Sequence, residues 1–141
     1  EAIKFPRPHN GFDFSFSGLK TAVINYVHTT EQKGEEINKA DVAASFQQAA
    51  VDVLVKNTVE AAKSVGIDKI AIAGGVAANS HLRRRVAEVA KEHGVNLFIP
   101  SLDLCGDNAA MVGAQAIYEY HDGNVSDTSL NATATLPIDY R

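Results

Sequence analysis

Cysteine is scarce in this sequence of 141 residues, and a single thiol, that of Cys105, excludes an internal disulfide. Such usage is typical of proteins that work in a reducing compartment. The sequence also lacks an apolar run of about 18 residues and a leader-like N-terminus, so we expect no membrane contact and a cytoplasmic location. Because the chain begins at Glu1 without an initiator methionine, we expect it to be a piece of a longer protein.

An excess of positive charge is lacking as well, since the chain has 13 Lys and Arg and 17 Asp and Glu, which gives a net charge of −4. No global basic field therefore attracts nucleic acid, and any RNA binding must be local or shared with a partner. The three arginines at 83–85 do not alter this, because consecutive helical residues point about 100° apart. We expect a solvated helix face there, with at most one or two side chains reaching phosphate.

Common catalytic motifs are missing too. The five histidines form neither an HExxH motif nor another i,i+4 pair that would bind a metal, and the sequence contains no G-x-S-x-G or C-x-x-C. Cys105 has no evident histidine partner, so we expect an inert thiol in a turn. These absences exclude the commonest hydrolase and zinc-site patterns.

The residues that are present predict one folded domain between irregular ends. Hydrophobic side chains make up 45% of the chain, near the ordinary globular value. Residues 1–11 are predicted to be a linker or loop and residues 12–123 an α/β lobe. Residues 124–141 are predicted to be an extended tail, packed at most by Leu130 and Leu136.

The first part of the lobe predicts one strand and two helices. Aromatic and polar residues alternate at 12–16 (FDFSF), which predicts a half-buried strand, and apolar spacing predicts a helix from 18 to about 28. A longer helix with Asn38 as N-cap and Gly66 as its stop is expected to cover one face of a sheet. On that helix, Gln47 and Gln48 are expected to face solvent.

A glycine turn organises the centre of the chain. Residues 70–73 (IAIA) predict a short strand buried on both faces, and Gly74 and Gly75 follow it directly. A helix opens next, with Asn79 or Ser80 as its N-cap. Free amides and a helix dipole converge at such a turn, which gives it the physical form of an anion site. An ordinary βα turn with glycines for packing is the alternative, and most Gly-Gly turns are of that kind.

A second strand-to-helix unit follows. Residues 95–99 predict a strand that ends at Pro100, and a helix resumes at Asp107 or Asn108. Two βα units in tandem predict neighbouring parallel strands, with both turns at the same edge of the sheet. The Asp107 carboxylate is then a candidate ligand for a metal or for a hydroxyl of a bound ligand, or simply an N-cap or first-turn acid of the helix. One carboxylate by itself is not a metal site.

Three segments together resemble one known family. They are 12–21 (FDFSFSGLKT), 74–79 (GGVAAN) and 106–111 (GDNAAM), in the order and spacing of the TsaD family, once called O-sialoglycoprotein endopeptidase or Gcp. The resemblance covers nearly the whole chain. It implies an actin-like ATPase fold (ASKHA, ribonuclease-H-like), with this chain similar to its C-terminal lobe: parallel βα units with a long covering helix.

The resemblance also implies a function. Members transfer the threonylcarbamoyl group from threonylcarbamoyl-AMP to N6 of the adenosine 3′ of the anticodon in tRNA, together with TsaB and TsaE. It implies that Asn79 contacts the adenylate beside Gly74 and Gly75, and that Asp107 binds a divalent metal, iron or zinc. The family's two metal-binding histidines and its first nucleotide-binding glycine turn have no counterpart in this chain, so the chain alone is expected to be inactive.

Two other functions remain open at this point. The older family name implies a metallopeptidase, but the sequence has no glutamate beside a histidine pair to activate water. A non-catalytic nucleotide-binding module is the other alternative. It predicts that Asp107→Ala leaves tRNA modification untouched in the intact protein.

Overall fold

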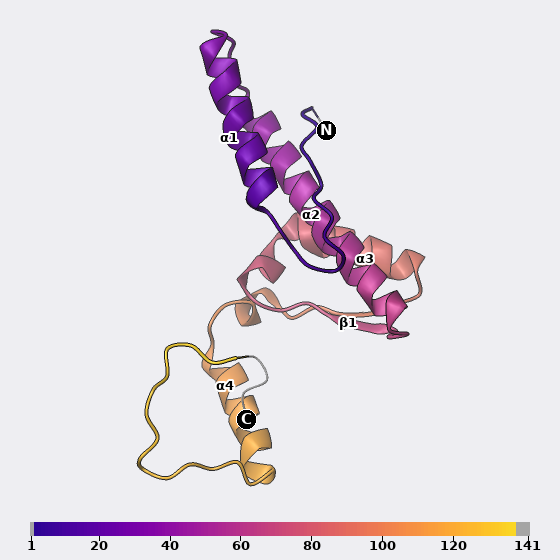
Figure 1. Ribbon diagram of the computed structural model, residues 1–141. Helices are drawn as coiled ribbons and strands as arrows, with labels where there is room; N and C mark the ends of the chain where they lie inside the picture. The colour runs from indigo at the N-terminus through magenta and orange to yellow at the C-terminus, as the bar shows by residue number, and fades with distance from the viewer. Residues whose placement is uncertain (1, 138–141) are drawn as a thin grey trace. The chain divides into compact units, whose positions relative to one another are not determined.

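A computed structural model describes residues 2–137, and the chain divides into two compact units, Glu1–Gly106 and Asp107–Arg141 (Figure 1). The first unit contains three α-helices and a parallel pair of strands. Over residues 107–137, the second unit contains one α-helix. Among the described residues, no helix is both long enough and apolar enough to cross a membrane.

The two N-terminal helices are α1 (Ser17–Gln32) and α2 (Lys39–Ser64). The predicted start of α2 is confirmed, because the Asn38 side chain accepts hydrogen bonds from the amides of Ala40 and Asp41, at 3.1 and 3.2 Å. Gly66 follows its end with φ at 70°, as a stop signal requires. The predicted end of α1 near residue 28 is too early, since the helix continues to Gln32.

The strand predicted at residues 12–16 is wrong. Only isolated bridges form there, from Asn10 to Phe12 and to Asp13, and the side chains of Phe12 and Phe14 are 52% and 49% exposed. An alternating pattern makes a strand only when another strand is available to pair with it. The segment is instead held by Asn57, whose amide donates to the Asp13 carbonyl at 3.2 Å.

The sheet consists of β1 (Lys69–Ala71) and β2 (Asn96–Phe98), joined by helix α3 (Ser80–Glu92). The strands are parallel, with Ile70 opposite Leu97 in the register. This pairing confirms the prediction of neighbouring parallel strands.

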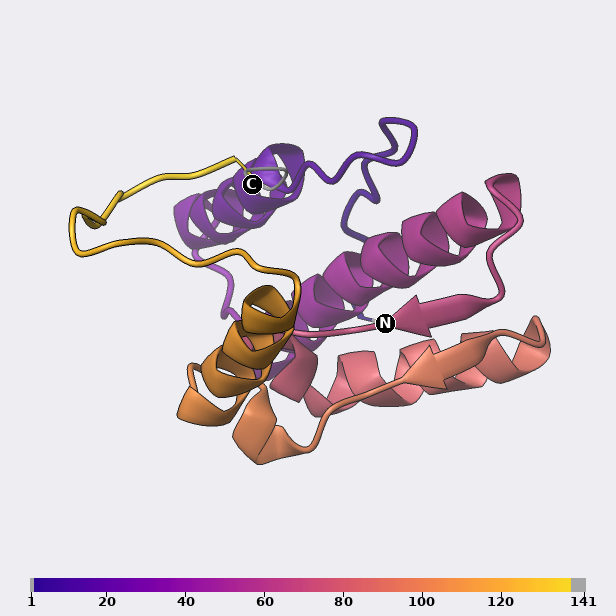
Figure 2. The same cartoon turned by 90° about the horizontal axis from the view of Figure 1, so that it is seen from below.

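The main core lies between this sheet and two helices. Both views place α2 and α3 on the same side of the strand pair (Figure 1, Figure 2), so α2 covers one face of the sheet as predicted. The buried members of this core are Val51, Val55, Val59, Ala62, Ile70, Leu82, Val86 and Val89. The opposite face is open, because Lys69 and Ala71 are exposed and Phe98 is 57% exposed. The prediction that the first strand is buried on both faces is therefore wrong.

A smaller core joins the N-terminal segment to α1 and α2. Phe5, Leu19 and Ala49 form its buried centre. Beside it, the Arg7 guanidinium bonds to the Asp52 carboxylate, with Nη2 to Oδ2 at 2.9 Å. The first residues are thus irregular, as expected, yet they are anchored to α2.

The second unit is built on α4 (Ala109–His121), whose N-cap is Asn108. No residue of this helix is buried. In the segment that follows, Leu130 and Leu136 are 74% and 50% exposed, so they do not pack the tail as predicted. Residues 138–141 of the predicted tail lie outside the described residues.

Candidate nucleotide site at the glycine turn

The glycine turn follows β1 and carries an element that the sequence did not predict. Gly74 has φ at 84°, a value that side chains other than glycine rarely adopt, and a 3-10 helix, η1 (Gly75–Ala78), precedes α3. A Cβ added at Gly75 would meet no heavy atom within 4 Å, and its φ is not positive. The space beside the Gly75 backbone is therefore open to a ligand.

Backbone amides are available at this turn. The amide of Ala77 donates to the Gly74 carbonyl at 2.9 Å, which closes the first turn of η1. The amides of Gly75 and Val76, one step earlier, donate to no acceptor among the described residues. Unpaired amides at the start of a helical turn are a preferred place for an anion.

Asn79 is the N-cap of α3, as the sequence predicted. Its Oδ1 accepts from the amide of Leu82 at 2.9 Å, while its Nδ2 donates to Gln47 Oε1 at 3.1 Å. Both ends of this side-chain amide are thus in use within the chain. The geometry fixes the start of α3 and ties it to α2.

The expectation that both glutamines of α2 face solvent is confirmed for Gln47, which is exposed, and is wrong for Gln48. Gln48 is half-buried, accepts from His81 Nε2 at 2.9 Å and donates to Asp52 at 2.7 Å. The other nitrogen of His81 lies 3.2 Å from an Arg84 nitrogen, so the neutral ring with its proton on Nε2 satisfies both contacts. These bonds and that of Gln47 fasten the beginning of α3 to the middle of α2.

Arg83 was missed by the sequence analysis, which assigned it to a solvated face. Its Nη1 donates to the Ala77 carbonyl at 3.0 Å, and its Nη2 donates to the Pro100 carbonyl at 2.7 Å. A sequence signal existed, because a side chain in the first turns of a helix leans back toward the N-terminus and hence over the preceding turn.

The second turn begins with another 3-10 helix, η2 (Leu102–Leu104), after β2. Cys105 is 3% exposed, and its thiol lies 3.5 Å from the Ser101 carbonyl. The Ser101 hydroxyl bonds to the exposed Asp103 carboxylate and lowers the pKa of that group. Asp103 is therefore an ordinary ionised surface acid at neutral pH.

Asp107 lies just after this turn, at the start of the second unit. The N-cap of α4 is Asn108, whose Oδ1 accepts from the Met111 amide at 2.9 Å, so the alternative that Asp107 is the cap is wrong. The Asp107 carboxylate is exposed and forms no ion pair with the described residues. Its chemistry suits one ligand position on a cation, but no group of three potential ligands forms within residues 2–137.

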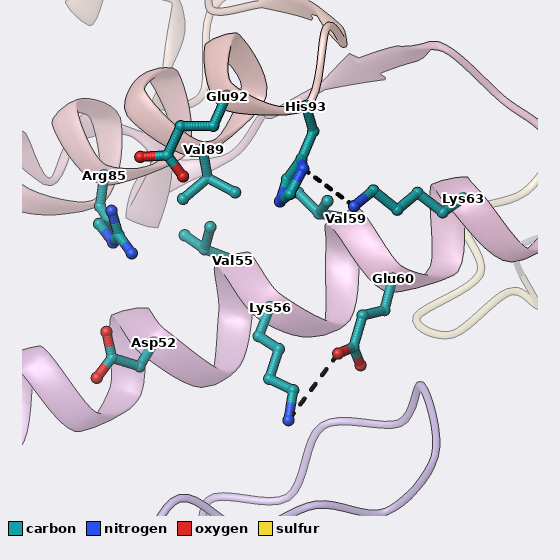
Figure 3. Close-up of a pocket in the computed structure, with 10 residues that line it drawn as sticks. All are labelled: Asp52, Val55, Lys56, Val59, Glu60, Lys63, Arg85, Val89, Glu92 and His93. Carbon is teal, nitrogen blue, oxygen red and sulfur yellow. Dashed lines mark hydrogen bonds and ion pairs between the residues drawn. The ribbon is translucent and has the colours of Figure 1, made fainter.

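A separate cavity of about 390 Å³ lies between α2 and α3 and contains none of the predicted site residues (Figure 3). Val55, Val59 and Val89 line it, and charged side chains of both signs surround them. Lys63 Nζ donates to His93 Nδ1 at 3.0 Å, and Lys56 lies 3.9 Å from Glu60. Because much of this charge is already paired within the chain, the groove is best explained as helix packing.

The structure therefore brings together one part of the predicted site. Gly74, Gly75 and Asn79 form a continuous turn in the first unit, whereas Asp107 belongs to the second. Chemically, this turn offers amide donors, the positive end of a helix dipole and open space, which suit a phosphate. It offers no acid or base for proton transfer.

Comparison with known proteins identifies the family of the chain. The family model described as TsaD, tRNA N6-adenosine threonylcarbamoyltransferase, matches residues 1–114. A Clostridium botulinum (strain Kyoto) protein named tRNA N6-adenosine threonylcarbamoyltransferase is 54% identical, and one of the same name from Clostridium perfringens (strain ATCC 13124) is 51% identical. Each alignment covers 100% of this chain, which spans 42% of the length of either relative. The chain belongs to the TsaD family.

Proposed function

We propose that this chain supplies the adenylate-binding part of a tRNA threonylcarbamoyltransferase. The observation that carries the proposal is the glycine turn, where two unpaired amides and open space precede an asparagine-capped helix. In this proposal the chain is the C-terminal lobe of an actin-like fold. The remaining site residues come from outside it.

The reaction assigned to the complete enzyme is an acyl transfer. N6 of a tRNA adenosine attacks the threonylcarbamoyl carbonyl of threonylcarbamoyl-AMP and a C–N bond forms. The bond from carbon to the phosphate oxygen breaks, AMP leaves, and N6 releases one proton to solvent. The amides of Gly75 and Val76 hold the phosphate that accumulates charge as AMP departs, and the α3 dipole adds to this stabilisation. Asn79 keeps α3 and its amides in place and lies beside the bound adenylate.

Asp107 is proposed as one ligand of a divalent metal, iron or zinc. The other ligands of this metal come from residues outside this chain. The metal would supply Lewis-acid chemistry. TsaB and TsaE are the proposed protein partners, and the cytoplasm is the proposed location because the acceptor is tRNA. None of the residues described here is assigned as a general base.

The test is Gly75→Ala, made in a complete transferase that contains this sequence. A Cβ at this position is clear of the protein, so the free energy of unfolding should rise by about 0.4–1 kcal/mol through the entropy of the unfolded chain. The same methyl group is attached to the Cα between the amides of Gly75 and Val76, where a bound phosphate would approach, so AMP affinity and transfer should fall by about tenfold or more. If Gly75 had only a structural role, its replacement by alanine would not raise the stability and lower the AMP affinity at the same time.

Gly18→Ala is the matched control. Gly18 also has open space around its Cβ position and no positive φ, but it lies in α1. It should raise stability and leave AMP affinity unchanged. Equal AMP affinity in the wild type and in Gly75→Ala would reject the glycine turn as the adenylate site.

A further inference from the structure

The side chain of Arg83 joins two segments that are distant in sequence. From the second turn of α3 it reaches Ala77 at the end of η1 and Pro100 at the exit of β2, with donor-acceptor distances of 3.0 and 2.7 Å. Nη1 also lies 3.8 Å from the Cys105 thiol. One guanidinium therefore contacts both strand-to-helix turns of the first unit.

The geometry of these contacts is specific to arginine. A guanidinium is planar and presents its donors in a fixed fork, so two carbonyls bound to one fork are held at a set separation. Ala77 is 2% exposed and Cys105 is 3% exposed, so the bonds lie against packed protein. A lysine carries the same charge on a single nitrogen and cannot reproduce the fork.

The charge of Arg83 is not paired with a carboxylate among the described residues. The ion pairs among the described residues join Arg7 to Asp52, Lys56 to Glu60 and Arg85 to Glu88, and none involves Arg83. Its donors are directed to backbone carbonyls and a thiol, which are neutral. The contacts thus hold backbone in place and do not neutralise a carboxylate.

We propose that Arg83 is a positioning residue, whose guanidinium sets the spacing between the glycine turn and the Ser101–Gly106 turn and thereby shapes the adenylate site. It acts through the Ala77 and Pro100 carbonyls and does not touch the ligand. The nucleotide part of this inference rests on the proposed function, whereas the link between the turns does not.

The link between the turns is tested without any ligand, through the reactivity of the only cysteine. Cys105 is buried, so iodoacetamide can alkylate it only when the turn opens. Arg83→Lys should raise the alkylation rate by about tenfold, because the loss of a hydrogen bond from a charged group raises the open fraction by about that factor. Arg84→Lys is the matched control, because Arg84 is exposed and its side chain hydrogen-bonds, among the described residues, only to His81 on its own helix. An unchanged alkylation rate in Arg83→Lys would overturn the proposal.

The effect on the adenylate site is tested by AMP titration of a complete transferase that contains this sequence. Affinity should fall by about tenfold in both Arg83→Lys and Arg83→Gln, with thermal midpoints within about 4 °C of the wild type. Wild-type affinity in Arg83→Lys, with a loss only in Arg83→Gln, would show that charge matters and spacing does not, which overturns the proposal. Failure of a complete wild-type transferase to bind AMP would reject the proposed function, and the alkylation rates would still decide the link between the turns.

Discussion

The two helices that follow the strands, α3 and α4, begin in the same way and end up in different surroundings. Each comes after a 3-10 helix, and each is capped by an asparagine whose Oδ1 accepts an amide three residues later, at 2.9 Å in both cases. Yet α3 buries Leu82, Val86, Val89 and Ala90, whereas α4 buries no residue.

The difference separates two levels of structure. Local chemistry, here an asparagine cap, is sufficient to define where a helix begins. Burial depends on which apolar surface lies nearby, and α3 has both α2 and the sheet to pack against. The turns differ in chemistry as well, since the one before α3 offers backbone amides and the one before α4 offers the Asp107 carboxylate.

The largest expected effect comes from removing that carboxylate. In a complete transferase, Asp107→Ala should lower the rate of tRNA modification by about 100-fold or more, because the proposed metal ligand is lost. AMP affinity at the glycine turn should stay within about twofold of the wild type, because the backbone amides are untouched. Transfer assays and AMP titrations of the same preparation measure both quantities.

Asp122→Ala provides the control for this prediction. Asp122 is also an exposed acid of the second unit, at the other end of α4, and should change neither quantity. If Asp107→Ala modified tRNA at the wild-type rate, the chain would be better described as a non-catalytic nucleotide-binding module.

The difference in burial predicts the next effect. Leu82 is 8% exposed and Ile117 is 60% exposed. Leu82→Ala should lower the free energy of unfolding by about 2–5 kcal/mol, while Ile117→Ala should change it by about 0.5 kcal/mol or less. Urea denaturation followed by circular dichroism measures both, and equal losses would mean that α4 is as well packed as α3.

The smallest effect concerns the caps that the two helices share. Asn79→Ala should lower the free energy of unfolding of the first unit by about 0.5–2 kcal/mol. Asn108→Ala should cause fraying of α4 alone. Asn79→Ser keeps a capping oxygen but loses the bond to Gln47, and it should fall between the wild type and Asn79→Ala. Hydrogen exchange of the first-turn amides distinguishes these cases, and identical exchange in all variants would show that the caps are dispensable.

The parts of the fold that follow from local signals were predictable. Asn38 and Gly66 delimit α2, Asn79 begins α3, and the tandem βα pattern gives the parallel strand pair. Each of these helix boundaries depends on a side chain that bonds to neighbouring backbone or on a backbone angle that favours glycine. The strand pair follows from the order of the two βα units along the chain. Such signals act within a few residues and are visible in the sequence.

The parts that depend on distant partners were not predictable. Residues 12–16 alternate like a strand but find no strand to pair with, and the face of β1 that was expected to be buried has no layer over it within the described residues. Arg83 is similar, because its carbonyl partners at Ala77 and Pro100 become neighbours only after the chain folds. The glycine turn was found from the sequence because all of its parts are consecutive.

The most direct test of the central claim is an NMR titration of the isotope-labelled chain with AMP, following the backbone amides of Gly74, Gly75, Val76 and Asn79. The account predicts saturable shifts that are largest at Gly75 and Val76, whose amides are unpaired, and small along the buried face of α3. Shifts that saturate elsewhere, or none at these amides in a complete transferase that binds AMP, would contradict it.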